Sequence, residues 1–162
     1  MENVLIEIKN KIPAELIYSL KKFDRTKKKT HPHKHNQYLE IVFFQEGKGF
    51  HWIDEERYPI HPPEIFIIKS NQIHYWDIES PKGEVLIIKN TFQTLTTDLV
   101  LKQLFYRISV HNNFTLDYNT GDEINTLFSL LQLNTLGDTN YSTVIFDGLI
   151  KVLFSKLLPE KK

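Results

Sequence analysis

The sequence contains no cysteine, which excludes disulfide bonds, thiolate metal ligands and a cysteine nucleophile. Histidine and carboxylate side chains are therefore the strong metal ligands available. Net charge is absent too, because twenty Lys and Arg residues balance twenty Asp and Glu residues. Such a chain lacks the positive field that attracts phosphates, so we expect no appreciable binding of this chain alone to duplex DNA.

Long apolar runs are also missing. No run approaches the roughly 20 residues that span a bilayer, and residues 1–9 lack the basic start and continuous apolar stretch of a secretory signal. We therefore expect no membrane partner and a cytoplasmic location. The length of 162 residues is usual for one domain, and 41% hydrophobic residues can build one sizeable core.

Short predicted strands alternate with turn-forming clusters in the first part of the chain. The strands are expected at Tyr38–Gln45, Gly49–Ile53, Ile65–Lys69, Tyr75–Ile78 and Val85–Asn90, with Val4–Ile8 and Glu15–Leu20 as earlier candidates. The second of these earlier candidates is also compatible with a helical turn. Turn clusters at 46–49, 54–57, 61–63 and 80–83 separate the later strands. This spacing is typical of an antiparallel barrel or sandwich, and we assign it to residues 1–92.

After Asn90 the apolar period changes from two to three or four residues, which is typical of helices. One helix of about four turns carries apolar residues from Leu95 to Ile108. A second helix begins near Asp122, and a third runs from Ser142 to Leu158 before Pro159. The region 93–162 is therefore predicted to be helical.

The third helix is apolar on several faces and so needs several neighbours. Its stripe of Ile145, Leu149, Val152 and Leu153 is self-complementary across a two-fold axis, which predicts a homodimer. Gly148 beside the stripe would allow close approach. In the alternative, the helix is enclosed within a monomer.

Basic residues gather ahead of the strands, where Lys21, Lys22 and Arg25 precede Lys27-Lys28-Lys29. We interpret this run as a solvated loop or sheet edge rather than a phosphate site.

A histidine-rich segment leads into the first long apolar strand. His33 and His35 share one face of an extended strand, because side chains alternate with a period of two. Glu40 follows, and His74 would approach from a neighbouring strand. Three imidazoles and one carboxylate suit a divalent transition metal such as Zn, Ni, Mn, Fe or Cu. Alternatively, these histidines hydrogen-bond within the barrel mouth and hold no ligand.

The spacing His33-x-His35, Glu40, Gly47 resembles the first cupin motif, and His74 stands where the histidine of the second motif would. The second motif departs from the family, because its Pro-x-Gly reads Lys69-Ser70-Asn71 and a later Gly reads Pro63. The segment 31–90 more closely resembles the N-terminal domain of AraC-type regulators. That resemblance is carried by His33, His35, Glu40-Ile41, Phe43-Phe44, Gly47-Lys48-Gly49, Ile53-Asp54, Tyr58-Pro59-Ile60, Ile65-Phe66-Ile67-Ile68 and Gln72-Ile73-His74-Tyr75-Trp76.

The resemblance implies a cupin-like antiparallel β-barrel (jelly-roll) followed by C-terminal α-helices that dimerise. It implies a small-molecule effector, a sugar or another small organic compound, bound inside the barrel. The ligand-binding residues would be His33, His35, Glu40 and His74, with Tyr38, Trp52 and Trp76 as ring platforms. Such regulators continue into a helix-turn-helix domain, so we expect this chain to be the sensory part of a longer protein that contacts DNA elsewhere.

The rival hypothesis is a stand-alone metal-dependent cupin enzyme, namely a dioxygenase, isomerase or decarboxylase. An enzyme of this kind needs no aliphatic C-terminal helix for partner contact, and it would be expected to keep the glycines that shape its metal-site turns. We therefore favour the non-enzymatic sensor.

Overall fold

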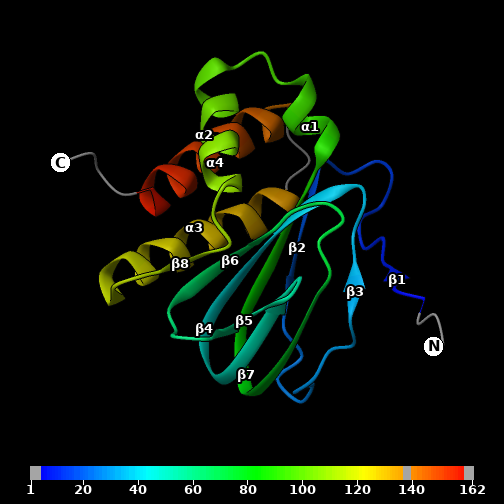
Figure 1. The fold of residues 1–162 in the computed structure, drawn as a ribbon. Helices are drawn as coiled ribbons and strands as arrows, with labels where there is room; N and C mark the ends of the chain where they lie inside the picture. Colours follow the sequence, from blue (N-terminus) through cyan, green and yellow to red (C-terminus); the bar gives the residue numbers. More distant parts are fainter. Residues whose placement is uncertain (1–4, 137–139, 159–162) are drawn as a thin grey trace.

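The computed structural model describes residues 5–136 and 140–158, which form eight strands and four helices (Figure 1). The strands are β1 (Glu7–Ile8), β2 (Tyr18–Lys22), β3 (His33–Lys34), β4 (Tyr38–Ile53), β5 (Glu56–Pro59), β6 (Glu64–Ile68), β7 (His74–Lys89) and β8 (Asn113–Thr115). The helices are α1 (Asn90–Leu95), α2 (Leu99–Ser109), α3 (Tyr118–Leu136) and α4 (Ser142–Leu157). The predicted mainly β fold with C-terminal helices is confirmed. Val4 and Pro159, which bound two predicted elements, lie outside the described residues.

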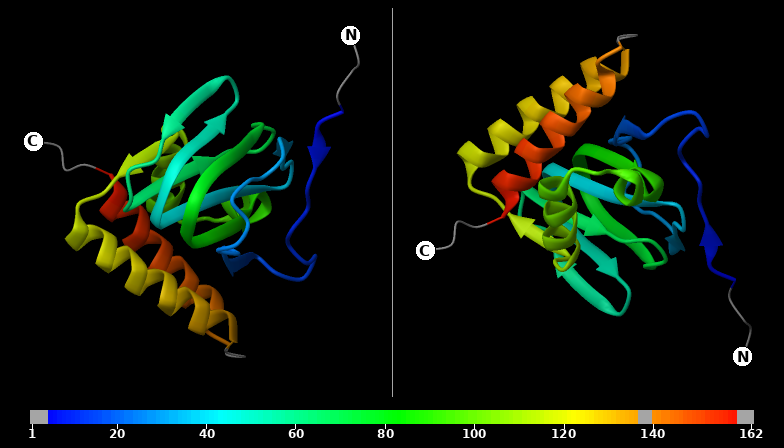
Figure 2. Two further views of the ribbon diagram at one scale, coloured as in Figure 1. Left: turned by 90° about the horizontal axis from the view of Figure 1, so that it is seen from below. Right: turned by 90° about the horizontal axis from the view of Figure 1, so that it is seen from above.

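The strands form one open sheet in the order β1-β3-β7-β4-β6-β8, with β2 also paired to β7 and β5 to β4. Neighbouring strands run antiparallel, except that β1 and β3 are parallel. The predicted barrel is thus a curved sheet that does not close on itself (Figure 2).

Two segments predicted as turns lie inside long strands. β4 and β7 each run for 16 residues, so the segments 46–49 and 80–83 do not reverse the chain. The pairing of β4 with β7 shifts register there, as in a β-bulge. Gly47 and Ser80 adopt positive φ angles of 136° and 47°. The turn-forming residues therefore produce a local irregularity within the strands instead of a hairpin.

Successive side chains of β4 enter two different hydrophobic clusters. Ile41 and Phe43 face the helices, whereas Val42 and Phe44 face the concave side of the sheet. Because both faces are covered, β4 from Tyr38 to Phe44 is buried at every position, which accounts for its continuous apolar sequence. We call these clusters the helix-side core and the concave-side core.

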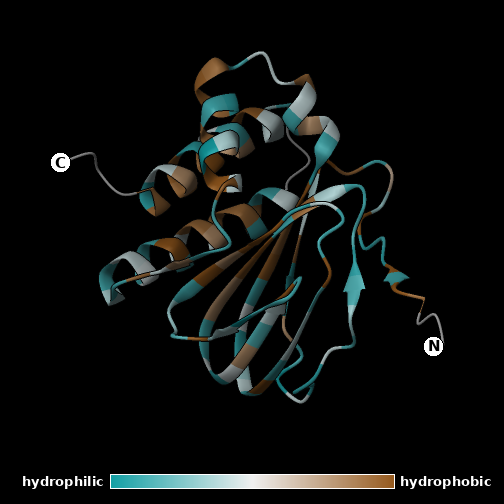
Figure 3. Ribbon diagram, viewed as in Figure 1, coloured by the Kyte–Doolittle hydropathy of each residue, from teal (hydrophilic) through white to brown (hydrophobic). Residues whose placement is uncertain are grey.

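The single helix predicted from Leu95 to Ile108 is two helices. α1 ends at Leu95, and α2 begins after Asp98, whose side chain accepts a hydrogen bond from the Leu101 backbone N–H at 3.0 Å. α3 and α4 lie side by side over one face of the sheet (Figure 2). Their apolar residues join those of the sheet in the helix-side core. Figure 3 shows in brown where hydrophobic residues lie along the helices and strands. Described residues of both regions, 1–92 and 93–162, therefore pack together in the helix-side core.

Among the described residues, no helix combines the length and apolar content needed to cross a bilayer.

Candidate metal and ligand site

Three strands bring the predicted metal ligands together. His33 lies on β3 and pairs with His74 at the start of β7, while Glu40 projects from β4. His35 follows β3 directly. All four side chains are buried, with at most 2% of any residue exposed. The structure thus collects residues that are up to 41 positions apart in the sequence, as His33 and His74 are.

The side-chain nitrogens of the three histidines converge. One ligand atom from each of His33, His35 and His74 lies within 4.8 Å of the others. The Nε2 atoms of His35 and His74 are 3.0 Å apart. Glu40 closes the group, because its Oε2 lies 2.8 Å from His35 Nε2 and its Oε1 lies 3.8 Å from His74 Nε2. Adjacent ligands bound at about 2.1 Å to one ion would stand roughly 3 Å apart, so these separations fit a shared cation.

The Nδ1 atom of each histidine meets a partner on its outer side. His33 Nδ1 is 2.7 Å from the His31 carbonyl, and His74 Nδ1 is 3.1 Å from His51 Nε2. His35 Nδ1 lies 2.6 Å from the Tyr38 hydroxyl. The His31 carbonyl can only accept, so His33 Nδ1 donates and its Nε2 presents a lone pair to the centre. The same tautomer in His35 and His74 would complete the arrangement of histidines bound to metals. His33 Nε2 is buried and has no hydrogen-bond partner among the described residues, so it offers a free ligand atom.

Burial keeps the imidazoles of His33 and His74 neutral at pH 7. It lowers the pKa of His33 to about 4 and the pKa of His74 well below 6.5. Burial also opposes the charged form of Glu40, but the contact with His35 and the nearby charges outweigh it and lower the pKa of this carboxyl group. The Lys11 ammonium group lies 3.7 Å from Glu40 Oε2 and favours the charged carboxylate. Neutral imidazoles with one carboxylate are the forms that bind a divalent cation, which would supply Lewis-acid chemistry here.

His51 belongs to this site and was missed by sequence reasoning. It is fully buried beside His74. Trp52, which was predicted to be a ring platform, lies on the opposite face of the sheet, where its ring stacks on that of Tyr75 with centroids 4.9 Å apart. Counting by twos from Glu40 places Trp52 on the inner face. The irregularity at 46–49 exchanges the two faces, so His51 points inward instead.

The other two ring residues lie on the inner side. Tyr38 is fully buried next to His35, as described above. Trp76 pairs across the sheet with His51, and the two rings are 5.8 Å apart. Trp76 lines the cavity that opens onto the metal-ligand cluster, whereas Tyr38 supports the cluster from behind.

A cavity of about 380 Å³ lies on the concave side of the sheet. His33, Glu40 and His74 form part of its lining. The remaining lining comes from Lys9, Lys11, Ser19, Lys21, Lys22, Phe23, Asp24, Lys27, Thr30, Trp76, Val85 and Ile87. The segment that we interpreted as a solvated basic loop or edge therefore contributes Lys21, Lys22 and Lys27 to this cavity, because β2 pairs with the distant strand β7.

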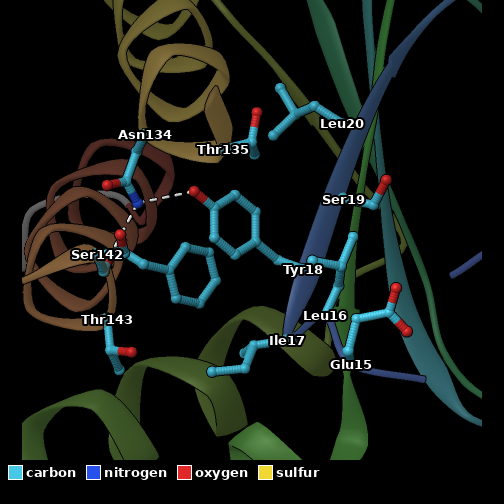
Figure 4. A pocket seen from close by; sticks show the side chains of 11 residues that line it. Glu15, Leu16, Ile17, Tyr18, Ser19, Leu20, Asn134, Thr135, Ser142 and Thr143 are labelled. Atoms are coloured by element: carbon cyan, nitrogen blue, oxygen red, sulfur yellow. Dashed lines mark hydrogen bonds between the residues drawn. The ribbon is translucent and has the colours of Figure 1, made fainter. Parts of the chain in front are cut away.

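A second hollow, of about 380 Å³, lies between β2 and the pair α3–α4 (Figure 4). Tyr18 reaches from β2 and stacks on Phe146 of α4, with ring centroids 4.0 Å apart. Asn134 of α3 donates to the Tyr18 hydroxyl at 2.7 Å and to the Ser142 carbonyl at 3.0 Å. These contacts attach the helix pair to the sheet.

The stripe predicted as a dimer interface is divided between surface and core. Ile145 and Val152 are 43% and 44% exposed, and Leu149 is partly buried. Leu153 has no exposed surface, because it packs in the helix-side core. A side chain without exposed surface cannot meet a second copy, so the prediction that Leu153 lies in the interface is wrong. Gly148 has no atom of another residue near the position of a Cβ, so its surroundings are open.

Residues 24–88 match the family model described as "Cupin domain". The match covers residues 24–88, which include β3 to β6, all but the last residue of β7 and most of the sheet, so this segment is similar to a cupin domain. A search of curated proteins finds no match.

The solved structures that are similar to this chain include the following three. Apo ToxT from Vibrio cholerae strain SCE256 aligns with a TM-score of 0.55 and 20% identity over 88% of this chain and 56% of that chain. The AraC-like transcriptional activator CuxR aligns with a TM-score of 0.47 and 12% identity over 90% of this chain and 51% of that chain. A predicted oxalate decarboxylase from Thermotoga maritima aligns with a TM-score of 0.38 and 18% identity over 44% of this chain and 64% of that chain. The likeness to ToxT shows a shared fold, and the other two are too weak to add to it. This chain spans less than two thirds of each of these proteins.

Proposed function

We propose that this chain is the effector-binding and dimerisation part of an AraC-type transcription regulator. The observation that carries the proposal is the concave-side cavity, which joins a buried His–Glu cluster to an apolar wall of Trp76, Val85 and Ile87. Cavities of this size and mixed lining are typical of small-molecule sites. The order of cupin domain and helices supports the assignment, as does the alignment with ToxT over 88% of this chain.

The N-terminal segment is the element through which a ligand would act. Its strand β1 pairs with β3, and the Lys9 carbonyl accepts a hydrogen bond from the Tyr38 hydroxyl at 3.3 Å. Ile12 inserts into the concave-side core. A ligand that prefers one position of this segment would shift the balance between two states of the regulator.

A homodimer is part of the proposal. Ile145 and Val152 expose apolar surface along α4, and Val144 beside them is 65% exposed. A two-fold axis would place this face against its copy. The regulator would act on DNA, in the cytoplasm, through a helix-turn-helix domain attached to this chain.

Ligand binding is tested by native mass spectrometry of the purified chain after incubation with an aqueous cell extract. We expect one bound compound per chain. Val85→Trp, which fills the cavity, should abolish its capture. Val110→Trp, at an exposed position after α2 and outside the cavity lining, should not. Equal capture by both variants, or no capture by the unaltered chain, would reject a cavity ligand.

Signal transmission is tested by a fusion of this chain to the helix-turn-helix domain of an AraC-type regulator, with reporter expression as the readout. We expect expression to change when the captured compound is added. Ligand binding without any change in expression would separate binding from regulation.

The second candidate is a metal-dependent cupin enzyme, favoured by the convergence of His33, His35, His74 and Glu40. These residues would hold the metal. Incubating the metal-loaded chain with the captured compound distinguishes the two functions, because an enzyme converts the compound and a sensor returns it unchanged.

A further inference from the structure

The cavity is lined by more cationic than anionic side chains. Its lining includes the lysines at positions 9, 11, 21, 22 and 27, but only Asp24 and Glu40 among carboxylates. Lys11 Nζ lies 3.7 Å from Glu40, and Lys9 Nζ lies 4.0 Å from Glu7. The ammonium groups of Lys21 and Lys27 have no carboxylate partner within 4.0 Å among the described residues. The cavity therefore has positive charge that its own walls leave partly unmatched.

The lysines come from separate parts of the chain and meet only in the fold. Lys9 and Lys11 belong to the N-terminal segment, and Lys21 lies on β2 opposite Val85 of β7. Val85 is part of the concave-side core, so Lys21 shares its face of the sheet. Burial and the charge of Lys11 lower the pKa of Lys9, as expected for ammonium groups that repel one another. A bound anion would offset this repulsion.

Trp76, whose side chain lines the cavity, also carries a hydrogen-bond donor that has no partner among the described residues. This donor, the Nε1–H group, is buried. Leaving such a donor unpaired costs about 1–3 kcal/mol, so an acceptor atom on a ligand would stabilise it. Carboxylate oxygens accept such bonds and also pair with ammonium groups.

The rest of the wall is apolar. The rings of Phe23 and Trp76 lie 5.2 Å apart, and Val85 and Ile87 continue the same surface. This part of the cavity fits a hydrocarbon or ring body.

We propose that the ligand of this cavity is a small organic acid, bound as its anion, with its carboxylate at the lysines and Trp76 and its apolar body against Phe23, Val85 and Ile87. This proposal rests on the proposed function, since it names the ligand class for the same cavity. An anionic ligand would differ from the neutral sugar that the family resemblance also allows.

The test compares acids with their primary amides, which have nearly the same shape but no charge. The probes are phenylacetate with phenylacetamide and cyclohexanecarboxylate with its amide, titrated calorimetrically into the whole chain at pH 7 and low ionic strength. We expect at least one acid to bind about tenfold more tightly than its amide. Lys11→Met and Lys21→Met should each weaken the acid about three- to tenfold and leave the amide unchanged.

Lys102→Met is the matched control, because Lys102 is exposed on α2 and lies outside the cavity lining. It removes the same charge and should leave acid binding unaltered. Circular dichroism verifies that each variant folds. The proposal would be overturned if the amides bound as tightly as the acids, or if none of the acids bound. It would also be overturned if Lys102→Met weakened acid binding as much as Lys11→Met.

The capture experiment above keeps this inference separate from the proposed function. A neutral compound captured by the unaltered chain and lost in Val85→Trp would overturn the organic-acid proposal and leave the sensor function standing. Failure to capture any compound would instead count against the sensor function.

Discussion

His51 Nε2 lies 3.1 Å from His74 Nδ1, and both rings are buried on the concave side of the sheet. This contact fixes the orientation of His74 and directs its Nε2 atom toward His35 and Glu40. A histidine that binds no metal itself thus positions one that would.

His51→Phe should keep the chain folded, because Phe66 and Trp76 already surround this position with aromatic rings. It removes the acceptor of the His74 Nδ1–H group. We expect the affinity for Zn²⁺, measured by competition with a chromophoric chelator, to fall about 10- to 100-fold. His61→Gln, at an exposed histidine, should have no effect. Unchanged zinc affinity in His51→Phe would remove His51 from the metal-site support.

Stability of the metal-free chain should decrease on acidification from pH 6.5 toward pH 4. Burial lowers the pKa of His33 to about 4 and that of His51 to about 3, whereas an unfolded histidine titrates near 6.5. Between these values the unfolded chain binds protons that the folded chain does not, so the free energy of unfolding falls as the pH falls. Carboxyl groups with lowered pKa values, such as Asp117, also stabilise the folded chain, but this stabilisation is lost only near and below pH 4.

Urea unfolding at pH 7, 6 and 5 with a chelator present measures this dependence. His51→Phe removes one of the neutral buried imidazoles and should therefore show a shallower loss. Burial raises the pKa of Glu84, so protonation of Glu84 increases the free energy of unfolding as the pH falls. This effect is the same in both proteins and cancels when their pH profiles are compared. Parallel pH profiles of the two proteins would contradict the expectation.

Two glycines should respond to alanine in opposite directions. Gly49 has a φ of 151°, and a Cβ there would lie 2.1 Å from the Asp77 backbone oxygen, so Gly49→Ala should destabilise the chain by about 1–3 kcal/mol. Gly148 is helical with open surroundings, so Gly148→Ala should stabilise it by about 0.5–1 kcal/mol. Urea unfolding measures both. A neutral Gly49→Ala would show that the strand irregularity can relax.

The interface residues are separated from the core residues by charge substitution. The double variant Ile145→Glu with Val152→Glu should be a folded monomer in sedimentation and circular dichroism, since both side chains are exposed on α4. Leu153→Glu should unfold, because it buries an unpaired charge in the helix-side core. A double variant that sediments as a dimer would assign the interface to another surface.

Local sequence patterns predicted much of the site. The two-residue period identified His33 and His35 as a pair, and the family spacing added Glu40 and His74. These four converge because β3, β4 and β7 are hydrogen-bonded neighbours. The patterns also predicted a mainly β fold followed by helices.

What the sequence did not reveal depends on pairing between distant segments. The face of β4 on which His51 lies follows from the irregularity at 46–49, which looks like an ordinary turn in the sequence. Lys21 enters the cavity only because β2 pairs with β7, more than sixty residues later. The burial of Leu153 likewise depends on how α4 packs against its neighbours, since apolar residues occur on most sides of that helix.

The alternation along β4 has a mechanical consequence. Leu39 and Ile41 support the helices, while Glu40 and Val42 face the concave side, and one backbone carries both sets. Glu40 lies between Leu39 and Ile41 on one backbone, so a backbone change at Glu40 acts on side chains of the helix-side core as well. The cavity and the helix pair thus lie on opposite faces of the same strand, and directly bonded residues of β4 connect them.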